Sequence, residues 1–242
     1  MIDKQSPIPI YYQIEEYLKK MIETGKFAIN QGIPSERELS GTFKVSRMTI
    51  RQAMNDLVNE GYLYRRKGKG TFVAEPKIEQ PLQGLTSFTE DMIKRGMVPL
   101  THVLHFHEKK ASLSIAKQLE VSEQELVYEI KRIRLADGIP MALETSYIPV
   151  KLVPGLTESI IQTSFYKYIE DILHLQIGEA VQALEANIVT LEDAKRLDIN
   201  AGSAVLQIHR HTKLTSGETL EWVQSIYRAD RYKFLINMQR SS

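Results

Sequence analysis

Residues 34–51 read PSERELSGTFKVSRMTIR, and this stretch contains two closely spaced helix starts. Ser35 and Glu38 have the spacing of a capping box, in which the side chain of each residue satisfies a backbone N–H of the other. Ser46 is a second N-cap residue, and it follows a short helix and a turn at Val45. Two short helices joined by a tight turn predict a helix-turn-helix.

The flanking residues extend this prediction to a whole domain. A helix that begins after Pro9 and ends at Gly25 precedes the quoted stretch. The helix that starts at Ser46 is expected to run to about residue 60, where Gly61 stops it. Two short extended runs, 62–65 and 71–74, then flank a basic tip rich in glycine. We therefore expect residues 1–75 to form a winged helix-turn-helix domain that binds DNA.

The third expected helix carries two arginines in a position suited to DNA. Arg47 and Arg51 are four residues apart, so they share one face, opposite the apolar stripe. Arginine there can make bidentate hydrogen bonds to guanine or bind a phosphate. The alternative is that both arginines lie on a solvated helix face. The glycines of the basic tip allow close approach to a duplex. The candidate DNA-binding residues are Arg37, Ser46, Arg47, Thr49, Arg51, Lys67, Gly68 and Lys69.

Length and composition limit the remaining possibilities. The chain has 242 residues, which is comfortable for two domains, and its net charge of +1 means that a nucleic-acid surface must come from local charge. It has no cysteine, which excludes disulfides and cysteine-type zinc sites. We see no signal peptide and no apolar run long enough for a membrane span, so we expect a cytoplasmic protein. Nucleophile-elbow, P-loop and dinucleotide motifs are absent, so we expect no catalytic residue and no cofactor.

The second part of the chain has a different character. Residues 76–82 are polar and bounded by prolines, so we expect a linker there. Asp137-Gly138 and Ser216-Gly217 are hairpin turn signals, with strands expected at 127–135, 140–149, 204–214 and 220–228. Residues 113–119 and 191–197 are expected to form short helices. The fold class of residues 83–242 is therefore α+β, with a mainly antiparallel sheet.

A pair of arginines marks a candidate ligand site in this part. Arg132 and Arg134 are two apart in an expected strand, so they point the same way and repel unless an anion or carboxylate lies between them. Glu144 in the next strand is a candidate partner, and a surface charge ladder is the alternative. Hydroxyl groups at 86–89 and 164–166, at expected helix starts, can complete an anion site.

Histidines and the single tryptophan give weaker signals. His105 and His107 share a strand face with His102 nearby, and His209 and His211 form a similar pair. A metal site needs more ligands than these pairs supply, so we expect ordinary polar strand positions and no metal. Trp222 is expected to pack in the sheet, with stacking on a sugar as the alternative.

The residues resemble a known family along the whole chain. Segments 34–39, 45–51, 57–61 and 68–73 are similar, in register, to the winged helix-turn-helix of the GntR family of bacterial regulators. Segments 85–92, 132–134, 164–166 and 227–232 resemble the effector-binding domain of its HutC subgroup, which shares its fold with chorismate lyase. The resemblance extends to amino-sugar repressors of that subgroup. It implies that Arg37, Arg47, Arg51 and Gly68 contact DNA.

The resemblance and the residues together imply a regulator. We expect a repressor of amino-sugar uptake and catabolism genes that binds operator DNA as a homodimer and is released by glucosamine-6-phosphate or N-acetylglucosamine-6-phosphate. Another anionic metabolite is one alternative, and an enzyme of chorismate-lyase fold is another, which a turnover assay with chorismate tests. The candidate effector-binding residues are Thr86, Ser87, Phe88, Thr89, Arg132, Arg134, Glu144, Ser164, Phe165, Tyr166, Glu221 and Tyr227.

Overall fold

The computed structural model describes residues 2–66 and 68–238, and it divides into two compact units. The first unit comprises Met1–Ile78 and the second Glu79–Ser242. Each unit has its own hydrophobic core and is described separately below. No helix among the described residues is both long enough and apolar enough to span a bilayer.

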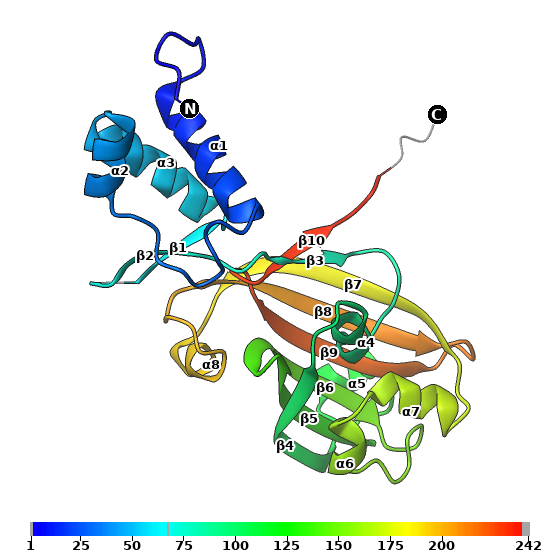
Figure 1. Ribbon diagram of the computed structural model, residues 1–242. Coiled ribbons are helices and arrows are strands. Elements are labelled where there is room, and N and C mark those ends of the chain that lie inside the picture. Colours follow the sequence, from blue (N-terminus) through cyan, green and yellow to red (C-terminus); the bar gives the residue numbers. More distant parts are fainter. Residues whose placement is uncertain (1, 67, 239–242) are drawn as a thin grey trace. The chain divides into compact units, whose positions relative to one another are not determined.

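The first unit has the predicted order of three helices and a hairpin (Figure 1). Helices α1 (Ile10–Glu23), α2 (Glu36–Phe43) and α3 (Arg47–Asn59) precede strands β1 (Leu63–Arg66) and β2 (Gly70–Val73). The capping box predicted at the start of α2 is present, with both reciprocal hydrogen bonds. Lys44 ends α2 in the left-handed conformation, at φ 52°, which turns the chain sharply into α3.

One apolar core holds these elements in place. The amphipathic helices bury their apolar stripes against one another and against the base of the β1–β2 hairpin. Ser46 caps α3 as predicted, because its side chain accepts a hydrogen bond from the backbone N–H of Thr49. This core fixes the exposed face of α3 relative to the hairpin. It consists of Ile14, Leu18, Ile33, Leu39, Ile50, Ala53, Met54, Leu57, Leu63 and Val73.

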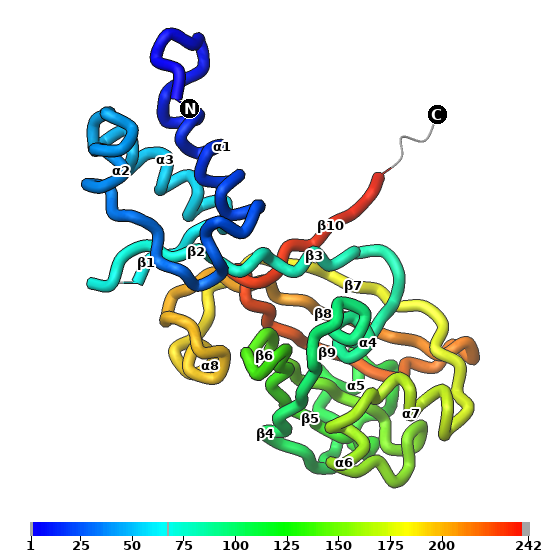
Figure 2. The backbone as a smooth tube through the Cα atoms, viewed as in Figure 1, coloured from blue at the N-terminus to red at the C-terminus, as the bar shows by residue number. Residues whose placement is uncertain are grey.

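The segment expected to be a linker contains a strand. Strand β3 (Ile78–Pro81) pairs with β10 (Tyr232–Leu235), far away in the sequence, and the two lie side by side in Figure 2. The prolines at 76 and 81 exclude a helix, as predicted, but an extended strand tolerates proline at its end. The pairing ties the start of the second unit to its carboxyl-terminal strand.

In the described part of the second unit, six strands form one antiparallel sheet. Their order is β4-β5-β6-β9-β8-β7. Their bounds are β4 (Pro99–Lys110), β5 (Leu126–Ala136), β6 (Ile139–Pro149), β7 (Ile177–Ile188), β8 (Ala204–Leu214) and β9 (Thr219–Arg228). The predicted turn at Asp137 and Gly138 joins β5 to β6, and both residues have positive φ, at 51° and 77°. The α+β fold class is confirmed.

Short helices cover the two faces of this sheet. Helices α6 (Glu158–Ile161) and α7 (Phe165–Asp171) pack on the face that carries Tyr128 and Ile130. Helix α5 (Leu113–Leu119) packs with Val127, and α8 (Leu191–Arg196) packs with Ile133, on the opposite face. Helix α4 (Phe88–Lys94) contacts β4. Alternation along β5 therefore directs even-numbered side chains toward α7 and odd-numbered ones toward α5 and α8.

Candidate functional site: a DNA-binding surface and a ligand cavity

An exposed groove in the first unit gathers the predicted DNA-binding arginines. It lies between the start of α2, the exposed face of α3 and the β1–β2 hairpin. Arg37, Arg47, Arg51 and Lys69 all line it, although they come from three separate elements. Arg47 is exposed and makes no hydrogen bond or ion pair with any described residue. Its guanidinium is therefore free to meet a base edge or a phosphate.

Arg51 differs from Arg47, because Glu36 holds it in place. Its Nε and Nη2 atoms donate to Oε2 of Glu36 at 3.0 and 2.9 Å. Arg65 Nη2 lies 3.9 Å from Oε1 of the same carboxylate and donates to Asn55 at 2.7 Å. The carboxylate of Glu36 thus fixes the orientation of the Arg51 guanidinium and neutralises part of its positive charge. Sequence patterns alone did not show this partner.

The hydroxyl and glycine candidates lie at the ends of the elements. Ser46 and Thr49 bond to each other through their hydroxyls at 2.8 Å at the amino terminus of α3. Gly68, at the hairpin tip, has φ +72°, which favours glycine over other residues. Lys69 is exposed beside it, whereas Lys67 lies outside the described residues.

The exposed face of α3 carries one apolar residue that the sequence analysis missed. Met48 is 68% exposed, between Arg47 and Thr49 in the first turn. The other methionine of the helix, Met54, is by contrast 2% exposed in the core of the unit. In a major groove Met48 would meet the methyl group of thymine. In the sequence, Met48 could have been recognised as exposed because it lies outside the apolar stripe of this helix.

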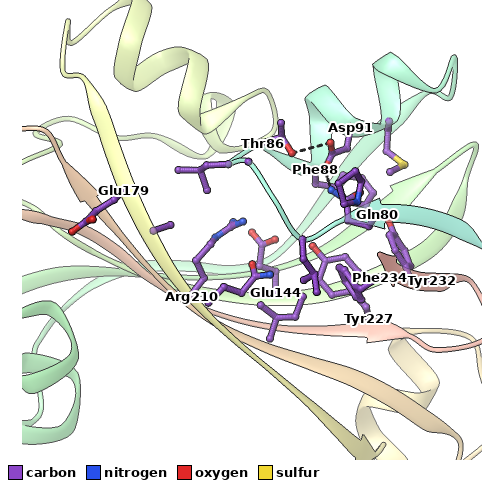
Figure 3. Close-up of a pocket in the computed structure, with 18 of the residues that line it drawn as sticks. Gln80, Thr86, Phe88, Asp91, Glu144, Glu179, Arg210, Tyr227, Tyr232 and Phe234 are labelled. Carbon is purple, nitrogen blue, oxygen red and sulfur yellow. Dashed lines mark hydrogen bonds between the residues drawn. The ribbon is translucent and has the colours of Figure 1, made fainter. Parts of the chain in front are cut away.

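The second unit encloses a cavity of about 310 Å³, called here the main cavity. Its walls come from β3, the chain before α4, α4 itself, and strands β6, β7, β8, β9 and β10. Figure 3 shows Glu144 and Arg210 with their charged groups turned toward one another in it. Four of the predicted effector-binding residues line it: Thr86, Phe88, Glu144 and Tyr227. Thr86 donates a hydrogen bond to Asp91 at 2.9 Å.

A narrower space of about 20 Å³, the inner cavity, shares Phe88, Glu144 and Arg210 with the main cavity. It brings together nine of the residues predicted for effector binding, from β5, β6, β9 and the starts of α4 and α7. Ser164 caps α7 but lines neither cavity. The residues of the inner cavity are Ser87, Phe88, Thr89, Arg132, Arg134, Glu144, Phe165, Tyr166, Arg210 and Glu221.

Arg132 is paired with Glu144, the partner expected from the sequence. The two residues are direct cross-strand neighbours, and Nε and Nη2 of Arg132 both donate to Oε1 of Glu144, the former at 2.7 Å. Burial alone would raise the pKa of Glu144, but the charges of Arg132 and Arg134 outweigh it, and the pKa lies below the ordinary value. Oε2 of Glu144 makes no hydrogen bond to a described residue. It remains available as an acceptor.

Arg134 has no carboxylate partner of its own. Its Nη2 donates to Oγ1 of Thr89 at 2.8 Å, and its guanidinium lies 4.8 Å from the ring centre of Phe88. Its buried Nε has no hydrogen-bond partner among the described residues. Burial, together with the charge of Arg132, lowers the pKa of Arg134 to about 10, so the group is still charged at neutral pH. The side chain is thus a buried cation with unused donors.

Arg210, on β8, is a third arginine in the cavities and was missed by the sequence analysis. It forms no side-chain hydrogen bond in the described part of the chain, and its Nε is buried. The period-two rule could have found it, because Thr212 pairs with Glu221 and Arg210 lies two residues before Thr212 on the same face. In the lining of the inner cavity, three guanidinium groups therefore meet two carboxylates, which leaves an excess of one positive charge there.

Glu221 takes part in a buried hydroxyl network. Its Oε1 accepts hydrogen bonds from Tyr166 at 2.7 Å and from Thr212 at 3.1 Å. Burial, together with the negative charge of Glu221, raises the pKa of Tyr166, so this hydroxyl stays protonated and donates. The network ties α7 to strands β8 and β9. Trp222 faces away from the cavities, since it stacks on Tyr147 on the opposite face, at 5.4 Å between ring centres.

Comparison with known proteins matches each of the two units to a separate family model. Residues 10–73 match the model of the gntR family of bacterial regulatory proteins, and residues 94–233 match the UTRA domain. The chain is similar to a crystal structure of PhnF from Mycobacterium smegmatis, with a TM-score of 0.67 and 27% identity. That similarity covers 94% of this chain and all of the other.

Two characterised relatives match over nearly their whole length. The HTH-type transcriptional repressor NagR of Bacillus subtilis strain 168 is 48% identical over 241 residues, which cover 100% of this chain and 99% of NagR. The mannosyl-D-glycerate transport/metabolism system repressor MngR of Escherichia coli K12 is 31% identical and covers 97% of this chain and 98% of MngR. With a winged helix-turn-helix and a UTRA domain, the chain belongs to the GntR family of bacterial regulatory proteins, in its HutC-type subgroup.

Proposed function

We propose that this protein is a transcription repressor of amino-sugar uptake and catabolism genes that a phosphorylated amino sugar releases from its operator. Two relatives with the same domain order, NagR and MngR, are both named repressors. The exposed Arg47 and the other residues of the groove supply the DNA-binding surface. The cavities of the second unit supply the ligand site.

The observation that carries the proposal is the uncompensated positive charge in the inner cavity. Buried cations are rarely left without an anion or hydrogen-bond acceptors, because the desolvation cost is high. Nε of Arg134 and Nε of Arg210 are both buried donors without a hydrogen-bond partner in the described part of the chain. A phosphate dianion offers several acceptors and the opposite charge, and it would satisfy both. A neutral sugar would not.

The volumes of the two cavities indicate which part of the ligand each cavity would hold. The main cavity, at about 310 Å³, is in the range of small-molecule sites and takes the sugar ring. Glu144 lines both cavities, and its Oε2 accepts a bond from a sugar hydroxyl or amino group in the main cavity. The inner cavity, at about 20 Å³, holds little more than one water, so entry of the phosphate moves α4 and α7 outward.

That movement gives the ligand a route to the DNA-binding unit. Thr89 and Phe88 on α4 are contacted by Arg134, and α4 follows β3, the strand that leads out of the first unit along the chain. A ligand shifts an equilibrium only through unequal affinity for two states. We propose that the phosphorylated sugar favours a state with α4 displaced, in which the repressor binds its operator weakly.

A direct test measures operator release. Binding-site selection from random duplexes identifies an operator, and fluorescence anisotropy follows its release on addition of glucosamine-6-phosphate or N-acetylglucosamine-6-phosphate. Release by either compound, but not by the free sugars, supports the proposal. Release only by another class of anionic metabolite would keep the regulator and reject the amino sugar.

The edge strand β7 supports assembly as a homodimer. It pairs with β8 on one side only, and its exposed apolar residues include Val181 and Ile188, exposed to 70% and 62%. Long apolar edge strands are normally covered, because their free backbone groups pair with other strands. A second copy of the chain offers an identical edge, and a two-fold symmetric dimer reads a palindromic operator.

We expect the second unit to dimerise without the first. A fragment of residues 78–242 retains β3 and its pairing with β10, whereas a fragment that began at residue 83 would lose both. Sedimentation should give a dimer at micromolar concentration, and Val181→Asp in the full chain should give a monomer. The control Leu113→Asp changes an equally exposed apolar residue on α5 and should remain dimeric. A monomeric fragment would contradict the assignment.

Arg47→Ala is expected to reduce discrimination between operator and random DNA. The substitution removes a base contact worth about 1–3 kcal/mol, or roughly five- to 150-fold in affinity. Lys69→Ala, at the hairpin tip, should instead weaken binding to all duplexes and reduce the salt dependence. Anisotropy titrations with both duplexes at two salt concentrations distinguish the two effects. Unchanged operator affinity in Arg47→Ala would remove α3 from the role of recognition helix.

A further inference from the structure

The face of the sheet opposite the cavities gathers two histidines and a glutamate. His105 and His107 lie on β4 and Glu129 on β5, and register pairs His107 directly with Glu129. The Nε2 atoms of His105 and His107 lie 3.7 and 3.5 Å from Oε2 of Glu129. The three ligand atoms all lie within 4.8 Å of one another. The sequence predicted no metal here, because the two histidines alone are too few ligands. The register of β4 on β5 adds Glu129 as a third.

The carboxylate of Glu129 is oriented by two donors that leave one oxygen free. Its Oε1 accepts hydrogen bonds from Lys109 Nζ at 2.7 Å and from Tyr147 Oη at 2.6 Å. Its Oε2 therefore points toward the two imidazole rings. Carboxylates that bind metals commonly have such a second layer of hydrogen bonds, which fixes their orientation and tunes their basicity.

The imidazole Nε2 atoms of this cluster have no competing hydrogen bond within the described ranges. The other histidine pair, on β8, is different. Nε2 of His211 lies 2.6 Å from the amide oxygen of Gln118, and Nε2 of His209 lies 3.1 Å from the side-chain nitrogen of Gln207. Of the two histidine pairs, only the one on β4 thus has both Nε2 atoms beside a carboxylate oxygen and without a hydrogen bond to a described residue. Nδ1 of His107 is buried and likewise has no partner among the described residues.

From this geometry we propose that His105, His107 and Glu129 bind a divalent zinc ion. Zinc bonds of about 2.0–2.2 Å to nitrogen and oxygen place tetrahedral ligand atoms roughly 3.3–3.6 Å apart. The two distances to Oε2 of Glu129 are close to that range. Small rotations of the half-exposed imidazole rings bring the two histidine nitrogens to a similar distance from each other. Two histidines and one carboxylate suit zinc, and water takes the fourth position. The ammonium of Lys109 opposes the ion, but its flexible side chain can swing to solvent.

A zinc ion at this site would stabilise the edge strand β4 next to its β-bulge. The pairing of β4 with β5 shifts register between Val103 and His105, which leaves Leu104 as an extra residue in β4. A metal bonded to β4 on one side and to β5 on the other cross-links the strands directly after this bulge. Since Glu129 and Arg132 differ in parity along β5, the metal lies on the opposite face from Arg132 and does not depend on the effector.

The test is zinc binding by the full chain, measured by equilibrium dialysis with metal quantification. We expect one zinc ion per chain at micromolar concentration and an increase in Tm on its addition. His105→Gln and His107→Gln should each weaken binding by at least about tenfold, as should Tyr147→Phe, which removes a donor that orients Glu129. Replacement of zinc by cobalt(II) should give the intense visible bands of tetrahedral coordination.

Two matched controls make the test specific. His102→Gln alters an exposed histidine of the same strand, and the double change His209→Gln with His211→Gln removes the other pair. Both controls should bind zinc as the wild type does. The proposal is overturned if the wild type binds no zinc at micromolar concentration, or if the control variants lose as much affinity as His107→Gln. Because His105 is exposed, its substitution tests the site without risk to the fold.

Discussion

Arg134→Ala is expected to remove most of the preference for a phosphorylated amino sugar over the free sugar. Arg134 is a buried cation of the inner cavity with unused donors, since among the described residues only its Nη2 has a hydrogen-bond partner, Thr89. Each charged hydrogen bond to phosphate contributes roughly 1.5–3 kcal/mol, so loss of two should weaken binding of the phosphorylated form by at least about a hundredfold. The free sugar, which does not reach Arg134, should bind as before.

Calorimetry with both sugars on wild type and variant measures this effect. The fold should survive the substitution, because Arg134 is a buried cation with one side-chain hydrogen bond, to Thr89, and no carboxylate partner of its own. Lys131→Ala is a suitable control, since it removes a positive charge from the opposite face of the same strand. Equal binding of free and phosphorylated sugar by the wild type would rule out the phosphate site.

Glu144→Ala is expected to destabilise the second unit by about 3–5 kcal/mol. The reason is that Arg132, 7% exposed, would lose the carboxylate that accepts two of its hydrogen bonds and would remain as a buried, unpaired cation. For a unit of this size the loss corresponds to a decrease in Tm of roughly 6–20 °C. Thermal unfolding followed by circular dichroism measures it. A Tm equal to that of the wild type would mean that the pair does not stabilise the fold.

The same pair predicts a pH dependence with a definite sign. The pKa of Glu144 is lowered in the folded state, so its ionised form stabilises the protein fully above the pKa of the unfolded chain, about 4.3. The stabilisation is lost as the pH falls through the lower, folded-state pKa. Glu144→Gln keeps the shape without the charge and should flatten this part of the profile. An unchanged acid limb in Glu144→Gln would assign the dependence to other carboxylates.

The DNA-binding unit was largely predictable because its signals are local. Ser35 with Glu38, and Ser46, define two helix starts through hydrogen bonds that span three residues. Such contacts do not depend on the rest of the chain, so the sequence shows them directly. The partner of Arg51 was not predicted, because Glu36 lies fifteen residues away and in another helix.

The cavity was predictable only in part. Arg132, Arg134 and Glu144 lie on two strands joined by a tight hairpin, so the period-two rule and one turn were enough to bring them together. Glu221 was predicted from the alternation along its strand, whereas Arg210 was missed. Both reach the cavity through β8 and β9, which enter the sheet next to β6 because β9 pairs with it. That pairing joins segments about eighty residues apart, and no local rule supplies it.

Strand β7 and the histidine cluster also depend on long-range strand pairing, which the local sequence does not predict. The residues of β7 include Ala180, Ala183, Glu185 and Ala186, which favour a helix by intrinsic propensity, and they form a strand because β8 offers a free edge. His107 meets Glu129 only through the register of β4 on β5. The sequence by itself determined the caps, turns and alternating faces, which depend on neighbouring residues. The tertiary structure decided which faces meet, because strand order and register follow from burial of the whole core.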